Sequence, residues 1–286
     1  MDMPFIGAEA IRDGILTRAR LRWNYESLHP GVYLAKGAEQ TILVDAVAAW
    51  LRTGRRGVVA GRAASALHGA NWVDAGTPIE IIADHTRPRE GVIVREERLA
   101  ADEIMQIGGL PVTSIPRTAL DLARHLPRDE AVAALDALAA ATGVTINEVL
   151  PLLARYRGAR GIRAARVALD LMDGGAQSPR ETSLRLLLID AGYPRPRSQI
   201  RVTDGATSVF LDMGYDEIKV GLDYEGEHHS EDRDQYVHDI GRSQLVAGQG
   251  WLDIKVVKEH SRAYILHRVD SAFQQRGWRP RFASSA

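Results

Sequence analysis

The stretch FLDMGYDEIKVGLDYEGEHHSEDRDQYVHDIGRSQLVAGQGW, from Phe210 to Trp251, decides the fold of the C-terminal half of the chain. It predicts two neighbouring strands and then a long helix. In the run from Ile218 to Glu225, strand alternation places Asp223 and Glu225 on one face and apolar residues on the other. Asp212 ends the preceding apolar run. Carboxylates this close together repel one another unless a cation joins them, and a divalent metal ion is the usual partner.

The composition favours a protein of the reducing cytoplasm. The chain has no cysteine, which excludes disulfides and thiolate metal sites. No apolar run approaches the roughly 20 residues that cross a bilayer, and the N-terminus lacks a secretory pattern. We therefore expect a cytoplasmic protein without a membrane partner. The net charge of -1 is uninformative about nucleic acid, because local clusters of charge cancel in the sum.

Residues 1–40 are expected to form a small winged helix-turn-helix. Thr17 can cap a short helix over Arg18 to Trp23, and a Pro-Gly turn precedes a strand in HPGVYLA, residues 29–35. This helix carries the candidate DNA-binding arginines Arg18, Arg20 and Arg22. They suit contact with phosphates in a recognition element. A surface helix with solvated arginines accounts for the same residues.

Residues 41–142 are expected to form a small α/β region. A buried helix is predicted over Thr41 to Leu51, and a later helix begins near Pro116, with Ser114 as a possible cap. The strands IEIIA and GVIVREE are predicted to form a hairpin or an adjacent pair. Another helix is expected from about Asp129 to Ala141.

The segments GVYLA, AASALHG, LPVTSIPRTALDLAR and AVAALDALAAA resemble actinobacterial proteins related to the AbiEi antitoxin family, over roughly residues 5–142. The resemblance implies a winged helix that binds promoter DNA and represses a toxin operon. A cognate toxin is the protein partner that it implies. It names no catalytic residue in this region.

Residues 143–175 are expected to be a helical connector. Thr145 can cap its first helix, and a series of four arginines follows at a spacing of three residues: Arg157, Arg160, Arg163 and Arg166. Such a series would form a basic stripe that tracks phosphates, or a solvated linker helix. The segment DGGAQSP then predicts the main domain boundary.

Residues 176–281 resemble the restriction-endonuclease-like fold, a mixed sheet flanked by helices, and in detail the very-short-patch-repair-related domains. The matching residues are Asp212, Asp223, Glu225, Gly226, His228 or His229, Asp239, Arg242, Gly250 and Trp251. Ser178 and Glu181 have capping-box spacing at the first helix, and Glu181 also shares a face with Leu184 and Leu188. The whole chain is therefore expected to be of the α+β class.

The second resemblance implies hydrolysis of phosphodiester bonds with Mg²⁺ or Mn²⁺ held by carboxylates. The implied metal ligands are Asp212 and Asp223, with Glu225 as a third ligand or a water-orienting group and Glu181 reaching the metal through water. The resemblance also implies His228 or His229 as general base or phosphate contact, and Arg242 at a phosphate or beside Asp239. Glu225 stands where the widespread PD-(D/E)XK motif has lysine. Lys219 and Lys255, on neighbouring strands, are possible substitutes.

Two functional hypotheses follow from these patterns. The first is a DNA-binding protein with a metal-dependent endonuclease domain. The alternative is a non-catalytic transcriptional regulator or antitoxin in which the nuclease fold is degenerate. The sequence leaves open whether the nucleic acid is DNA or RNA.

Overall fold

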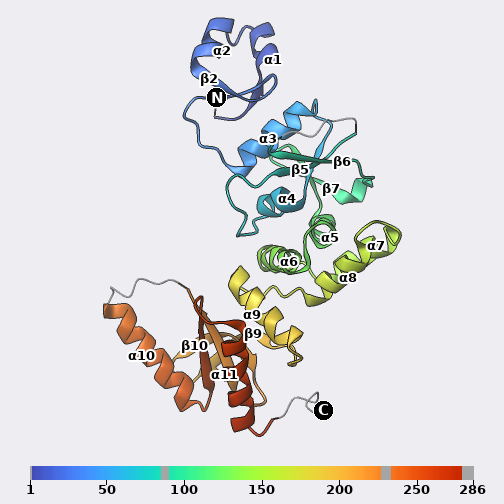
Figure 1. Cartoon of the computed structure of the whole chain (residues 1–286). Coiled ribbons are helices and arrows are strands. Elements are labelled where there is room, and N and C mark those ends of the chain that lie inside the picture. Colours follow the sequence, from blue (N-terminus) through green and yellow to red (C-terminus); the bar gives the residue numbers. More distant parts are fainter. Residues whose placement is uncertain (1, 85–89, 227–232, 279–286) are drawn as a thin grey trace. The chain divides into compact units, whose positions relative to one another are not determined.

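A computed structural model describes residues 2–84, 90–226 and 233–278 of the chain, without the side chains of 233–239. The chain forms two compact units, Met1–Met172 and Asp173–Ala286 (Figure 1). Both units combine helices with sheets, which confirms the expected α+β class. Within the described residues, no helix has the length and apolar character needed to cross a membrane.

The first unit begins with a small winged-helix motif. Its elements are β1 (Phe5–Ile6), α1 (Gly7–Arg12), α2 (Arg18–Asn24), β2 (Tyr25–His29) and β3 (Val32–Ala35). The strands pair in the order β1-β3-β2. Thr17 caps α2, because its hydroxyl accepts the backbone N–H of Arg20 at 3.2 Å. The predicted helix and its cap are thus confirmed, and Leu21 is the residue of α2 that is buried.

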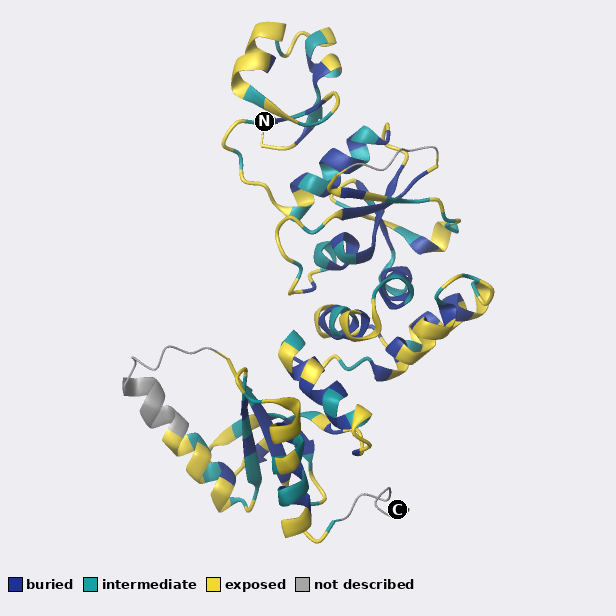
Figure 2. Cartoon of the chain, viewed as in Figure 1, coloured by how far each residue is buried: buried dark blue, intermediate teal, exposed yellow. Residues whose placement is uncertain are grey.

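A five-stranded mixed sheet follows. Its strands and covering helices are α3 (Ile42–Arg52), β4 (Val58–Ala60), α4 (Gly61–Leu67), β5 (Ile79–Ile82), β6 (Val92–Arg95), the 3₁₀ turn η1 (Ala101–Glu103), β7 (Ile104–Ile107) and β8 (Leu110–Thr113). The strand order is β6-β5-β4-β8-β7. Strands β5 and β6 are adjacent but parallel, so they do not form a hairpin. Apolar residues of α3 and α4 pack on this sheet, where Figure 2 shows buried strands.

Four helices complete the first unit: α5 (Ile115–His125), α6 (Arg128–Thr142), α7 (Ile146–Arg155) and α8 (Ile162–Leu171). Ser114 precedes α5 but makes no side-chain capping bond, whereas Thr145 and Glu148 form a capping box on α7. Helices α7 and α8 pack on α5, so the predicted connector is part of the first unit. Arg157 and Arg160 precede α8, and the four arginines therefore do not form a stripe along one helix.

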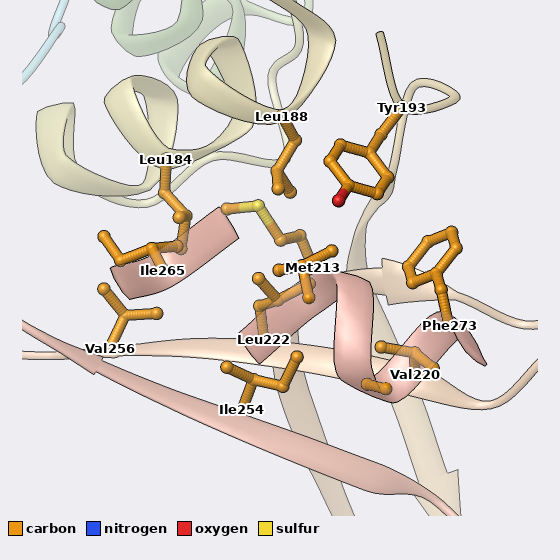
Figure 3. Packing of buried hydrophobic residues seen from close by; sticks show 12 residues of the cluster. Leu184, Leu188, Tyr193, Met213, Val220, Leu222, Ile254, Val256, Ile265 and Phe273 are labelled. Carbon is orange, nitrogen blue, oxygen red and sulfur yellow. The ribbon is translucent and has the colours of Figure 1, made fainter. Parts of the chain in front are cut away.

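The second unit is a four-stranded sheet between helices. Its elements are α9 (Pro179–Asp190), β9 (Arg197–Thr203), β10 (Ser208–Tyr215), β11 (Val220–Glu225), α10 (Arg233–Gly248), β12 (Leu252–Val257) and α11 (Arg262–Gln275). The strand order is β12-β11-β10-β9, and β11 and β12 are parallel. Leu222 and Ile254 pack with residues of α9 and α11 on one face (Figure 3). Val246 of α10 packs on the other face.

Candidate functional site

The candidate site lies where β10 and β11 stop pairing. The ladder between them ends at the pair Met213 and Leu222. Beyond that pair, the backbone N–H of Asp212 donates to Oδ1 of Asp223 at 2.9 Å, and the N–H of Tyr224 donates to Oδ2 of Asp212 at 2.7 Å. Each aspartate therefore satisfies a backbone donor of the facing strand. This pairing gives both residues a structural role.

Strand β10 is irregular at Asp212. Leu211 packs in the core on the α10 face, whereas Met213 packs in the core formed with α9 and α11. Residues two apart in a regular strand point to the same face, so regular alternation fails here. The irregularity allows the carboxylate of Asp212 to reach the backbone of β11.

Two cations surround Asp223, which is only 4% exposed. Nη1 of Arg242 lies 2.5 Å from its Oδ2, and Nζ of Lys255 lies 3.2 Å from the same oxygen. Lys255 reaches it because the parallel register of β11 and β12 pairs these two residues. Arg242 also donates to the carbonyl of Phe210 at 2.7 Å. The negative charge of Asp223 is therefore compensated within the protein.

Lys255 lies among three carboxylates. Besides Asp223, its Nζ is 3.2 Å from Oε1 of Glu225 and 3.4 Å from Oδ2 of Asp253. Asp253 was absent from the predicted site, although its spacing from Lys255 places both on one strand face. Lys219 lies elsewhere and donates to the carbonyl of Gln249. Lys255 is thus the predicted substitute lysine that reaches the carboxylates.

Glu181 is buried and held by the start of α9. Its Oε1 accepts the hydroxyl of Ser178 at 2.9 Å, and its Oε2 accepts the N–H of Gln177 at 2.8 Å. Ser178 in turn accepts the backbone N–H of Glu181, which confirms the predicted capping interaction. The charge of Glu181 also acts on Asp212 and raises its pKa.

The carboxyl groups of the cluster titrate at different pH. Burial, together with the neighbouring charges of Glu181 and Asp223, raises the pKa of Asp212 to about 7, against the lowering effects of the Tyr224 N–H and Arg242. Burial opposes ionisation of Asp223 too, but the hydrogen bond and charge of Arg242 hold its pKa below the usual value. Burial and the charge of Asp223 raise the pKa of Asp253.

The magnesium prediction depends on Asp212, Asp223 and Glu225. The ligand atoms of these three residues do not all lie within 4.8 Å of one another. In the described part of the chain, the group of three acidic or histidine residues that meets this distance is Glu97, Asp121 and His125. A metal ion on Asp223 would also compete with Arg242 and Lys255. The residues as arranged are therefore not a ready metal site, and the magnesium assignment stays a prediction.

Several predicted residues lie outside what the structure describes. His228 and His229 are among residues 227–232, and the side chain of Asp239 is likewise not described.

Beside Arg242, a hollow of about 420 Å³ opens between α10 and the β9–β10 turn, lined in part by Asp204 and Thr207. This hollow connects Arg242 with the surface.

The predicted DNA-binding helix α2 is almost entirely solvent-exposed. Arg18, Arg20 and Arg22 are exposed, and none of them forms an ion pair with any described residue. By contrast, nearby Arg55 makes two hydrogen bonds to Glu9. Trp23 of α2 is 73% exposed. Helix α2 therefore presents to solvent three cationic side chains and an aromatic ring that no other described part of the protein covers.

These features define a two-unit α+β protein with an exposed basic helix and a buried, charge-compensated carboxylate cluster. Residues 46–171 match the AbiEi antitoxin C-terminal domain. The match begins within α3 and ends with α8, so it includes most of the predicted connector, residues 143–171, and leaves out the winged helix and the second unit. The AbiEi resemblance is confirmed for this segment. No comparison shows the very-short-patch-repair resemblance.

Two relatives are known only as uncharacterized proteins of Mycobacterium tuberculosis, from strains CDC 1551 and H37Rv. Each is 29% identical to this chain over 177 residues. The alignment covers 62% of this chain and 65% of the length of each relative. No solved structure matches the chain.

Proposed function

We propose that this protein is a DNA-binding transcriptional regulator of the antitoxin type, which acts at the promoter of a toxin–antitoxin operon and has the toxin as its partner. The match of residues 46–171 to an antitoxin domain carries the proposal. The exposed arginines of α2, in the winged helix that precedes this domain, support DNA contact. Arginine binds phosphate through several N–H donors, and a short helix of this motif fits the major groove.

The arrangement of α2 supports contact with both backbone and bases. Leu21 faces the protein, so the outward face of the helix centres on Trp23, with Arg18 and Arg22 to one side and Arg20 to the other. In the proposed complex, the arginines hold the helix between phosphates and Trp23 lies toward the groove. Phosphate contacts of this kind set affinity and make it dependent on salt.

The test is DNA binding by the double variant Arg18→Ala, Arg22→Ala. Fluorescence anisotropy with a duplex from the chain's own promoter, over a series of salt concentrations, should show weaker binding and a salt slope reduced by about one to two. The matched control is Arg163→Ala, Arg166→Ala, which removes two exposed arginines of α8. An unchanged slope in the first variant, or an equal loss in the control, would remove the recognition role of α2.

A second candidate function is metal-dependent nucleic-acid cleavage by the second unit. The observation in its favour is the gathering of Asp212, Asp223, Glu225 and Lys255, the residue types of a PD-(D/E)XK site. Cleavage of plasmid, duplex, single-stranded DNA and RNA should be measured with Mg²⁺ and Mn²⁺. Cleavage by the wild type, but not by Asp212→Ala, Asp223→Ala, would support a nuclease.

The binding assay distinguishes the two functions. If neither the wild type nor the Asp212→Ala, Asp223→Ala variant cuts any substrate while both still bind promoter DNA, the second unit is a degenerate nuclease fold within a regulator. The control for the cleavage experiment is Asp216→Ala, which removes an exposed carboxylate paired with Arg197 in the same unit.

A further inference from the structure

A second group of ionisable residues belongs to the first unit, whereas the site described above belongs to the second. Helix α5 carries Arg117, Asp121 and His125 at successive intervals of four residues, so these side chains lie along one face. They meet Glu97, which follows β6. Arg117 is fully buried and Asp121 is 1% exposed.

The arginines occupy one side of each carboxylate. Nε of Arg117 donates to Oδ1 of Asp121 at 2.9 Å, and its Nη2 donates to Oε2 of Glu97 at 2.7 Å. Arg124 donates to the same Oε2 at 2.9 Å and more weakly to Oε1 at 3.3 Å. The atoms of the group that the arginines bind weakly or not at all are Oδ2 of Asp121, Oε1 of Glu97 and Nε2 of His125.

Two of these three atoms lack a hydrogen bond. Among the described residues, Oδ2 of Asp121 and Nε2 of His125 are both buried without a hydrogen-bond partner. Nε2 of His125 lies 3.0 Å from Oε1 of Glu97, close enough for an ion pair but without hydrogen-bond geometry. Buried polar atoms are normally satisfied, so two orphans in one group indicate a missing partner.

The charges of the cluster do not balance. The carboxylates of Glu97, Asp121 and Glu103 face the guanidinium groups of Arg117 and Arg124, which leaves one negative charge. Arg155 also reaches Glu103 and pairs with the exposed Asp102, so the count with these two residues included is four carboxylates against three guanidinium groups. A buried charge without compensation is costly, and either a bound cation or a protonated His125 would supply it.

We propose that Glu97, Asp121 and His125 bind a divalent transition-metal cation of the zinc type. Their ligand atoms already lie within 4.8 Å of one another. Ligands about 2.1 Å from a zinc ion lie roughly 3.0 to 3.4 Å apart, so only a small adjustment is required. Two carboxylate oxygens and one imidazole nitrogen match zinc, with a fourth position open to water.

The surroundings support this assignment. Arg117 and Arg124 orient the carboxylates mainly through Oδ1 of Asp121 and Oε2 of Glu97, as outer contacts do in metal sites. Glu97 also lines a hollow of about 500 Å³, together with Glu96 and Arg98.

The experiment uses the full chain, treated with a chelator and dialysed against limiting Zn²⁺. Elemental analysis should find one zinc per chain that His125→Gln and Asp121→Asn each lose, with a rise in Tm on zinc addition in the wild type only. The matched control is Glu96→Gln, an acid that lines the same hollow but lies outside the group. Circular dichroism checks that each variant is folded.

The other histidines require a second control, because His228 and His229 are adjacent in the sequence and can bind zinc themselves. The double variant His228→Gln, His229→Gln should keep the zinc described above. Cobalt substitution of the wild type should give the visible bands of a four- or five-coordinate site with oxygen and nitrogen ligands, and this readout needs no variant to fold.

Two results would overturn the proposal. One is zinc that survives in His125→Gln and disappears from the His228, His229 double variant. The other is a wild-type chain that binds no zinc while nuclear magnetic resonance shows a protonated His125 ring. In that case the proton, rather than a metal ion, balances the cluster.

Discussion

Replacing Asp212 with asparagine should stabilise the second unit above neutral pH. The pKa of Asp212 is about 7 in the folded protein and close to 3.8 when unfolded. The folded state therefore holds a proton that the unfolded state has lost between these values, and stability falls as pH rises through this window. Above pH 7 the full penalty of the buried charge is present.

The size of the effect follows from the shift in pKa. A difference of this size corresponds to about 4 kcal/mol, which we reduce to roughly 2 kcal/mol because Asp212 is partly exposed and solvent screens it. Asparagine resembles the protonated acid and can still accept the N–H of Tyr224. Asp212→Asn should therefore stabilise the second unit by about 2 kcal/mol at pH 8 and have little effect at pH 4.

Hydrogen exchange of β10 and β11 peptides in increasing urea measures the free energy of unfolding of the second unit alone. Asp223 titrates below the window, because Arg242 holds its pKa low, and Asp253 should account for the dependence that remains in the variant. Asp216→Asn is the control and should change stability by less than about 0.5 kcal/mol. A wild-type stability that is flat from pH 4 to 8, or a variant no more stable at pH 8, would refute the pKa argument.

Two further changes test the first unit. Arg117→Met removes the guanidinium that pairs with the buried carboxylates of Asp121 and Glu103 and with the half-buried one of Glu97, and it should destabilise this unit by about 3 to 5 kcal/mol. The exposed Arg163→Met should cause almost no change, and equal urea midpoints would contradict the network. Gly61→Ala should cost about 1 to 3 kcal/mol in thermal unfolding, since φ is 58° and the new Cβ would lie 2.2 Å from Glu80. Gly158→Ala, with open space around its Cβ, should be nearly neutral.

Local signals in the sequence predicted most of the elements. Capping residues marked α2, α7 and α9, and alternation in the run to Glu225 placed the apolar side chains of β11 in the core shown in Figure 3. These features depend on neighbours within a few residues. The parallel pairing of β5 and β6 was left open, because the direction of a pair depends on how the chain returns across the sheet rather than on either strand.

The network around Arg117 shows why part of the chemistry escaped prediction. The sequence predicts the helix that contains Arg117 and Asp121, but it predicts no role for either residue. In the structure both are buried, because α5 is covered by neighbouring helices and its charged residues meet Glu97 and Glu103 from other segments. Only tertiary packing brings these acids together, and residue spacing along the chain does not predict that packing.

The carboxylate cluster of the second unit is explained differently by the two functions. A nuclease needs Asp223 to hold an external cation at the moment of reaction. Here Asp223 already has Arg242 from α10 and Lys255 from β12, so its charge ties a helix and a strand to the splayed end of the sheet. Those ion pairs stabilise the fold without any ion, which suits a regulator. Catalysis would require Arg242 to release Asp223. A nuclease would therefore depend on the replacement of Arg242 by a metal ion at this carboxylate.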